Sequence, residues 1–374
     1  MIADWPHFRG PLRNGHSAET GLPNRFPAGG PRRLWTVDVG EGYSTVSVAG
    51  GLAYTAGNTA GNDLVTAVNV ATGRVAWQRK YPCSPGDYGG PRATPAVVGG
   101  RVLMLSREGL LSCYGAKDGA VVWQRPLARE AKAPVPNWGF ASSPVAIGDR
   151  VYVNMGAGGA CVDLASGKLV WASAPGTAGY ASPIPLKAGG QSLLLIFAGT
   201  ELVAVDPRDG SRRWSFPWQT SYDVNAADPV LVGEDIFIAS NYGKGGALVR
   251  VDRGKPSAKW QTRSMRNHFN SCVLVGGFLI GNDENTLRCI DAATGAERWA
   301  MRGLGKGGLI AADGKLVILT ERGELVLANA TGSAFQELGR AQVLEGTCWS
   351  QPTLSDGKVF CRSHEGALVC VGLR

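Results

Sequence analysis

Hydrophobic and polar residues alternate along most of the chain in short runs that end at glycine-containing turns. Residues 142–175, SSPVAIGDRVYVNMGAGGACVDLASGKLVWASAP, show the pattern in full. A first short strand ends at a Gly-Asp turn, RVYVNM alternates as a second strand, and GACVDL follows as a third. The turn ASGK then leads into an outer strand, LVWASA. Alternation with a period of two, broken by tight turns, predicts a unit of four antiparallel strands.

The sequence of the last hairpin of this unit recurs at several places along the chain. AVNVATGRVAW at 67–77 is matched by CVDLASGKLVW at 161–171, AVDPRDGSRRW at 204–214 and CIDAATGAERW at 289–299. The tryptophans at this position are 39 to 48 residues apart and are Trp35, Trp77, Trp123, Trp171, Trp214, Trp260 and Trp299. A period of roughly 40–50 residues with four strands per unit is typical of a β-propeller blade. Each tryptophan is expected to wedge between neighbouring blades, because one blade alone cannot bury its faces.

The number of blades follows from the starts of the inner strands, near residues 45, 93, 142, 181, 227, 271, 308 and 350. The last unit stops after three strands, whereas RRLWTVDV at 32–39 is an outer strand without a unit. We therefore predict an all-β fold, an eight-bladed β-propeller closed by the N-terminal strand, which completes the last blade. The seventh blade is degenerate and places Phe335 near the tryptophan position. Residues 32–374 are expected to form this single domain, and residues 1–31, which have no period, an arm over its surface.

Composition narrows the classes of function. The formal net charge is +8, but lysines and arginines are scattered, so nucleic acid is not an expected partner. The longest apolar run, SLLLIFAG at 192–199, is too short for a membrane span. The start MIADWPHFRG is typical of a mature terminus with an added methionine. We therefore expect a periplasmic or secreted protein whose signal peptide has been removed, and we expect a monomer.

The recurring unit A-x-D-x-x-T-G-x-x-x-W resembles the tryptophan-docking repeat of the pyrroloquinoline-quinone-like propellers, over residues 32–374. That family includes quinoprotein alcohol dehydrogenases and the BamB-like outer-membrane assembly lipoproteins. The start DWPHFRGPLRNGHSAETGL and the segment RGLGKGGLIAADGKLVILTERGELVLANA resemble an exported subgroup common in planctomycete-type bacteria. The resemblance implies the propeller fold and leaves the activity open.

Several features that the resemblance leads one to expect of a quinone-dependent member are missing. No two cysteines are adjacent, no Asp- or Glu-rich insertion offers a calcium cage, and no CxxCH haem motif is present. No cofactor and no metal site are therefore predicted, and pyrroloquinoline quinone with calcium stays an alternative. Four cysteines fall in one column of the repeat, which is expected to require small buried side chains: Cys113, Cys161, Cys289 and Cys370.

Candidate ligand-binding residues lie where the inner strands begin beside the central channel. Three residues before the inner-strand proline, six of eight units carry a large or cationic side chain, and neighbouring loop positions add aromatic and polar groups. The candidates are Tyr43, Tyr88, Arg92, Trp138, Phe140, Tyr180, Asn225, Phe269, Asn270, Lys306 and Trp349. One interpretation is that the aromatic residues only fill a wide channel. The cations would be costly as filling, however, which favours a ligand-binding funnel.

The residue types in this funnel suggest its ligands. Aromatic faces with polar groups suit a saccharide or another flat polar molecule, and two cations suit a carboxylate or sulfate. We expect binding of a small polar or saccharide-like ligand or of a peptide. A protein partner is a further alternative. The first alternative is a carbohydrate-active lyase or hydrolase with His268, Tyr222 and Asp223 as acid–base candidates. The second alternative is a quinone-dependent dehydrogenase.

Overall fold

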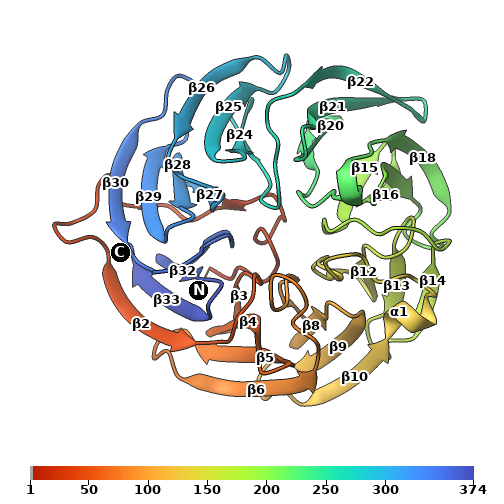
Figure 1. The fold of residues 1–374 in the computed structure, drawn as a ribbon, viewed down its shortest axis with the longest axis horizontal. Helices are drawn as coiled ribbons and strands as arrows, with labels where there is room; N and C mark the ends of the chain where they lie inside the picture. Colours follow the sequence, from red (N-terminus) through yellow and green to blue (C-terminus); the bar gives the residue numbers. More distant parts are fainter. Residues whose placement is uncertain (1–2) are drawn as a thin grey trace.

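Within residues 3–374, which the computed structural model describes, the strands form eight sheets around a central axis (Figure 1). The first four blades consist of β3 (Ser47–Ala49), β4 (Leu52–Thr59), β5 (Asn62–Asn69), β6 (Val75–Pro82); β7 (Ala96–Val98), β8 (Arg101–Leu105), β9 (Leu110–Gly115), β10 (Val121–Pro126); β11 (Val145–Ile147), β12 (Arg150–Val153), β13 (Ala160–Asp163), β14 (Leu169–Ala172); and β15 (Ile184–Ala188), β16 (Gln191–Phe197), β17 (Glu201–Val205), β18 (Arg212–Pro217). A short helix, α1 (Leu127–Glu130), follows β10, and a 3-10 turn, η1 (Ser221–Asp223), follows β18.

The remaining four blades complete the ring. They consist of β19 (Val230–Val232), β20 (Asp235–Ser240), β21 (Gly245–Asp252), β22 (Lys255–Thr262); β23 (Val273–Val275), β24 (Phe278–Asp283), β25 (Thr286–Asp291), β26 (Glu297–Arg302); β27 (Gly308–Ala312), β28 (Lys315–Leu319), β29 (Glu324–Asn329), β30 (Glu337–Gln342); and β31 (Thr353–Ser355), β32 (Lys358–Arg362), β33 (Ala367–Gly372), with β2 (Arg32–Asp38) as the outer strand. The predicted eight-bladed β-propeller is confirmed.

Strand β2 closes the ring. It pairs antiparallel with β33, so that Trp35 lies opposite Cys370 and Asp38 opposite Ala367. The first and last parts of the chain thereby share one sheet, and Figure 1 shows β2 in red beside β33 in blue. This pairing confirms the predicted closure by residues 32–39 and satisfies the ladder groups that β33 would otherwise expose.

The repeated hairpin between the third and fourth strands has a definite turn chemistry. In the first blade the side-chain oxygen of Asn69 accepts hydrogen bonds from the backbone N–H groups of Ala71 and Thr72. Gly73 follows at a φ of 73°, a left-handed conformation that favours glycine. The strand register shifts between Ala67 and Val68, one step from the tryptophan. Sequence therefore repeats here because the turn, the bulge and the tryptophan work as one unit.

The docking tryptophans join each blade to the next. The indole N–H of Trp77 donates to the carbonyl of Ala116 at 2.8 Å, and that of Trp171 to the carbonyl of Pro207 at 3.0 Å. A Cβ atom added at Gly210 would lie 2.5 Å from the Trp171 ring, so the turn glycine of one blade makes room for the tryptophan of the preceding blade. Trp35, Trp123, Trp260 and Trp299 make the same kind of bond. The predicted wedge between blades is confirmed.

The degenerate seventh blade corrects one expectation. In six other blades the tryptophan lies opposite a small residue of the third strand, and in the seventh blade that register position is Gly339, opposite Leu327. Phe335 is not at this position; it lies in the preceding turn, and its ring contacts Trp299 edge-on. The aromatic ring of Phe26, from the segment before β2, covers Gly339 instead. An aromatic residue distant in sequence thus replaces the missing tryptophan.

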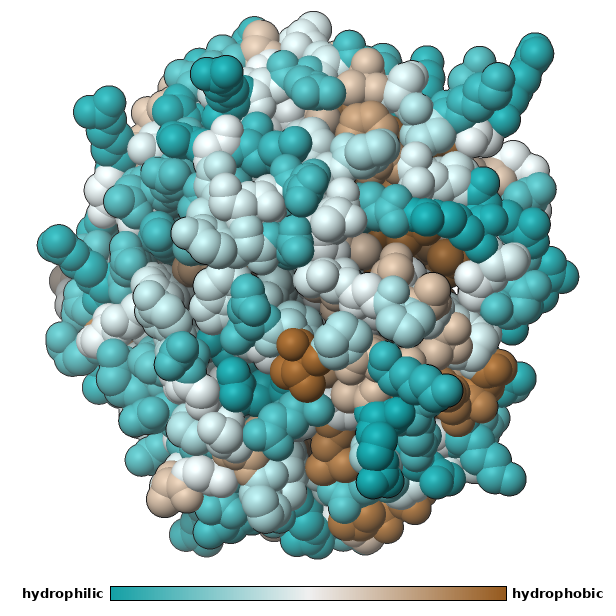
Figure 2. All heavy atoms as spheres, turned by 45° about the vertical axis from the view of Figure 1, so that its right-hand side comes forward, coloured by the Kyte–Doolittle hydropathy of each residue, from teal (hydrophilic) through white to brown (hydrophobic). Residues whose placement is uncertain are grey.

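The cysteine column and the outer surface follow the repeat. Cys113, Cys161, Cys289 and Cys370 are fully buried, each opposite a docking tryptophan, and all eight cysteines are free thiols. The face shown in Figure 2 is largely hydrophilic, with hydrophobic residues in small separate groups. In the part of the chain described, no helix is long and apolar enough to cross a membrane.

Residues 3–22 cross the face of the ring where first and second strands turn. Trp5 exchanges two backbone hydrogen bonds with Val48 of β3, and β1 (His16–Ser17) lies parallel to β27. The carboxylate of Glu19 accepts the N–H groups of Asp356 and Gly357 at the turn between β31 and β32. In Figure 1 this segment, in red, passes through the middle of the ring. It therefore covers the channel at this end.

Candidate functional site

A cavity of about 320 Å³ lies at the opposite end of the channel, where the inner strands begin. All eight blades contribute, because each loop that leads into an inner strand reaches the axis at the same height. The sequence predicted eleven ligand-binding and three acid–base residues. Ten of these fourteen line this one cavity: Tyr43, Tyr88, Arg92, Trp138, Tyr180, His268, Phe269, Asn270, Lys306 and Trp349. The cavity also includes Phe8 and Tyr242, which the sequence did not single out.

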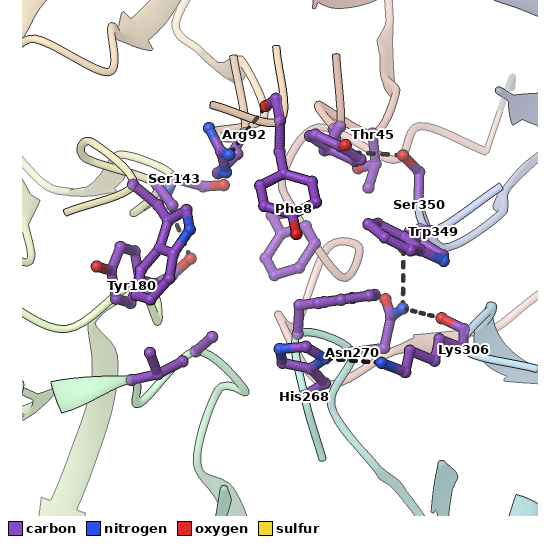
Figure 3. Close-up of a pocket in the computed structure, with 18 of the residues that line it drawn as sticks. Phe8, Thr45, Arg92, Ser143, Tyr180, His268, Asn270, Lys306, Trp349 and Ser350 are labelled. Atoms are coloured by element: carbon purple, nitrogen blue, oxygen red, sulfur yellow. Dashed lines mark hydrogen bonds between the residues drawn. The ribbon is translucent and has the colours of Figure 1, made fainter. Parts of the chain in front are cut away.

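Phe8 comes from the segment that covers the other end of the channel, and it is in the middle of the close-up view of the cavity (Figure 3). The neighbouring Arg9 is fully buried and donates hydrogen bonds to the carbonyls of Asn14 and Cys272. The carbonyl of Pro6 accepts the N–H of Val97 at 2.8 Å. These contacts hold Phe8 as a floor, so that the cavity is a cup and not a through-channel. Because the segment has no period, no repeat position marks Phe8 in the sequence.

A belt of side-chain oxygens links neighbouring blades beneath the aromatic residues. The N–H of Thr94 donates to Ser143 Oγ at 2.9 Å, and the N–H of Ser143 donates to Ser182 Oγ at 3.3 Å. The N–H of Ser182 in turn donates to Asp228 Oδ1 at 2.7 Å. Ser143 and Ser182 line the cavity, and their hydroxyl groups accept these bonds; the Ser182 hydroxyl also bonds to the Asp228 carboxylate, whereas the Ser143 hydroxyl hydrogen is left to donate. The belt fixes the wall and offers a donor to a ligand.

Aromatic rings follow one another around the cup and, through Tyr222, around its mouth. Successive ring centroids are 4.6 to 6.2 Å apart, within the range of favourable aromatic pairs. The series runs through Tyr180, Trp138, Tyr222, Tyr242, His268, Phe269, Trp349 and Tyr43. Burial raises the pKa of Tyr180 to about 12 and also raises the pKa values of Tyr43 and Tyr242, so all three hydroxyl groups stay protonated at neutral pH.

Two cations enter this largely apolar cup. Arg92 lies 5.4 Å from the centroid of the Tyr43 ring and donates to the carbonyls of Asp87, Tyr88 and Gly90. Burial lowers the pKa of Arg92, but an arginine remains charged. Lys306 Nζ lies 3.4 Å from His268 Nδ1. Throughout residues 3–374, neither cation has a carboxylate oxygen within 4.0 Å. The two side-chain cations therefore have no direct carboxylate partner; the Glu321 carboxylate, outside the lining, instead accepts the indole N–H of Trp349 at 2.7 Å and the backbone N–H of Lys306 at 3.3 Å.

His268 is uncharged at neutral pH. Burial, and then the charge of Lys306, lower the pKa of His268 to about 4. Because Lys306 can only donate, Nδ1 of His268 is the acceptor, and its Nε2 carries the hydrogen, 3.2 Å from the hydroxyl of Tyr242. Tyr242, His268 and Lys306 thus form one connected polar series along the wall (His268 and Lys306 are labelled in Figure 3).

Four predicted residues do not line the cup. Phe140 is fully buried and packs near Gly109, in the core between blades, and not beside the channel. Asn225 is buried as well; its side-chain N–H groups donate to the carbonyls of Ala198, Gly199 and Trp218. Both predictions as ligand contacts are corrected: the Phe140 ring packs in the core, and the Asn225 amide is used in hydrogen bonds to the backbone.

The other two residues lie at the mouth. Tyr222 and Asp223 belong to η1, outside the cavity lining, and Tyr222 is 65% exposed. Both have left-handed backbone conformations, with φ of 68° and 55°. Of the three predicted acid–base residues, His268 is therefore the one that lines the cup.

The lining does not fit a calcium-bound quinone. Calcium takes oxygen ligands, mainly carboxylates. Among the described residues that line the cup, none is Asp, Glu or Cys, and no group of three His, Cys, Asp or Glu residues in residues 3–374 could hold a metal ion.

Known proteins share this architecture. BamB from Moraxella catarrhalis superposes with a TM-score of 0.68 at 16% sequence identity, covering 91% of this chain and 99% of that chain. Quinohaemoprotein alcohol dehydrogenases from Pseudomonas putida HK5 and from Comamonas testosteroni each superpose with a TM-score of 0.74 at 12% identity, covering 99% of this chain and 80% of theirs. A comparison with curated protein sequences finds no match.

At such identities, the structural likeness shows the fold alone. The profile of the family described as outer membrane protein assembly factor BamB matches residues 61–301 and 283–373, which is most of the chain. These comparisons do not support the predicted planctomycete-type subgroup. The chain belongs to this BamB family of pyrroloquinoline-quinone-like β-propellers.

Proposed function

We propose that the cup binds a small polar ligand with an anionic group, and that a saccharide unit is the class that suits it best. The observation that carries this proposal is that Arg92 and Lys306 enter one aromatic cavity without a carboxylate partner. Both side chains are half-buried, so each charge is only partly hydrated and can still bind an anion directly. An anionic ligand would supply the acidic partner that both cations lack.

The remaining lining suits a ring that carries hydroxyl groups. Ser143 has a hydroxyl hydrogen that can donate to a ligand, whereas the side-chain N–H groups of Asn270 are used on the carbonyls of Lys306, Gly307 and Trp349. The side-chain oxygen of Asn270 is thereby fixed as an acceptor. A donor and an acceptor on an apolar aromatic wall are usual features of a small-molecule site, which is mostly apolar with a few fixed polar groups.

Isothermal titration calorimetry of the full chain with glucuronate and glucose tests the proposal. Lys306→Ala should weaken glucuronate binding by about 1–3 kcal/mol, the contribution of a charge-assisted hydrogen bond. Lys80→Ala, which removes an exposed lysine far from the cup, is the matched control and should change nothing. Equal affinity for glucose and glucuronate, or binding of acidic peptides alone, would contradict the proposal.

A carbohydrate-active enzyme that uses the same cup is the second candidate function. The observation that favours it is that His268, one of the acid–base candidates, lines the cup and is joined to Lys306 and Tyr242 through its two ring nitrogens. A lyase would produce ultraviolet absorbance from the new double bond, and a hydrolase would produce reducing ends. Release of product that His268→Gln abolishes, with binding retained, supports catalysis. Binding of substrate without any product supports the binding function alone.

A further inference from the structure

The structure around the cup indicates how much of a longer ligand it can take. Phe8 closes the floor, and the segment that carries Phe8 covers the far end of the channel. A polymer therefore has no path through the ring. A volume of about 320 Å³ is also at the low end of small-molecule sites, which are about 300–1,000 Å³. Only the end of a chain can reach the two cations.

Three tyrosines surround the mouth of the cup in strained conformations. Tyr88, Tyr222 and Tyr242, which we call the rim tyrosines, have φ of 54°, 68° and 56°. A bulky residue in the left-handed region is an outlier, and such strain persists where the surroundings impose it, often at functional sites. Tyr88 is 63% exposed and Tyr222 is 65% exposed, although aromatic residues gain most from burial.

The surroundings that hold the rim tyrosines can be identified. Arg92 Nη2 donates to the carbonyls of Asp87 and Tyr88, so a cation of the cup also fixes the loop of a rim tyrosine. The hydroxyl of Thr220 donates to the carbonyl of Val224 and thereby closes the turn that carries Tyr222. The ring of Tyr222 contacts those of Trp138 and Tyr242 edge-on, at centroid distances of 6.2 and 5.6 Å. The rim is a preformed aromatic surface at the mouth of the cup that contains Arg92 and Lys306.

We infer that the protein captures the end of an anionic oligosaccharide: the terminal acidic unit enters the cup, and the next sugar ring packs on the rim tyrosines, chiefly Tyr222. This inference rests on the proposed function and adds to it a second subsite and a preference for chain ends. The acidic group is a carboxylate or a sulfate, since both offer the oxygens that Arg92 and Lys306 can bind. The formal net charge of +8 adds long-range attraction for such a chain.

Calorimetry on the full chain tests the second subsite with four probes: glucuronate, glucose 6-sulfate, a disaccharide with glucuronate at its non-reducing end, and a neutral disaccharide of the same linkage. The acidic disaccharide should bind about tenfold more tightly than glucuronate, as one aromatic contact would provide. The neutral disaccharide should bind weakly. The monosaccharide that binds more tightly identifies the acidic group as carboxylate or sulfate.

Tyr222→Gly is the decisive variant. Glycine adopts the left-handed conformation without strain, so this change removes the ring while the backbone is preserved or stabilised. It should abolish the tenfold gain of the disaccharide and leave glucuronate affinity unchanged, because Tyr222 does not line the cup. Ala60→Gly is the matched control: Ala60 has a φ of 49° and is exposed on the turn between β4 and β5, so strain is relieved without loss of a ring.

End capture is measured with a glucuronate-containing polysaccharide prepared at two chain lengths. At equal mass, competition against the labelled disaccharide should increase in proportion to the number of chain ends. Competition that depends on mass alone, or a disaccharide no tighter than glucuronate, would overturn this inference while glucuronate binding still supports the proposed function. If no acidic sugar binds to the unmodified chain, both proposals fall together.

Discussion

Removing one docking tryptophan tests the physical account of the ring. Trp171 is 8% exposed, its ring contacts Tyr152 at a centroid distance of 6.1 Å, and it packs on Gly210 of the next blade. Trp171→Ala should lower the free energy of unfolding by about 3–5 kcal/mol, as for other large-to-small substitutions in cores. No further penalty is expected, because the hydroxyl of Tyr152 also donates to the carbonyl of Pro207 and keeps it satisfied.

Trp214 offers a comparison within the same chain. It is equally buried, at 8% exposed, but in the described part of the chain its indole N–H has no hydrogen-bond partner on the next blade. Trp171→Phe should therefore cost about 0.5–1.5 kcal/mol more than Trp214→Phe, which is the net contribution of one hydrogen bond. Urea denaturation followed by circular dichroism gives both values from the shift in midpoint at constant slope. An unchanged midpoint for Trp171→Ala would refute the reasoning.

Three further predictions concern the rest of the fold. Deletion of residues 1–40 removes β2 and Trp35 and should collapse thermal stability; an unchanged melting temperature would contradict ring closure. Phe26→Ala should cost about 1–3 kcal/mol in urea denaturation through the uncovered seventh blade, and no effect would show that Phe26 does not replace the tryptophan. Burial raises the pKa of Asp228 to about 6, despite the nearby Arg9. Since this folded-state pKa exceeds the unfolded value, the unfolding free energy should fall by about 2 kcal/mol as the pH rises from 4 to 6, relative to Asp228→Asn; parallel profiles would disprove it.

The periodic part of the structure was predictable from sequence. Trp77, the turn glycine Gly119 and the alternation between them recur because every blade junction needs the same contact, and one physical requirement repeated along a chain is visible as a period. The loops before the inner strands were predictable for a related reason: equivalent positions in a ring converge on one axis. Ten candidates in the cup follow from that geometry alone.

The features that the sequence did not reveal depend on contacts that occur only once and are not repeated from blade to blade. Phe8 and Phe26 belong to a segment without a period: Phe8 lies in a cavity formed by loops of all eight blades, and Phe26 covers Gly339, which is distant in sequence. Phe140 and Asn225 were misassigned because a position near the axis does not decide whether a side chain turns to the channel or into the core. The belt through Ser143 and Ser182 was missed because serine before proline is ordinary loop chemistry.

A crystal structure of the full chain grown with glucuronate tests the central claim most directly. The account predicts electron density for one sugar ring above Phe8, with its carboxylate within about 3.2 Å of Lys306 Nζ or of the Arg92 guanidinium. Density for glucuronate only outside the cup, or a cup that holds water alone at saturating glucuronate, would contradict the account.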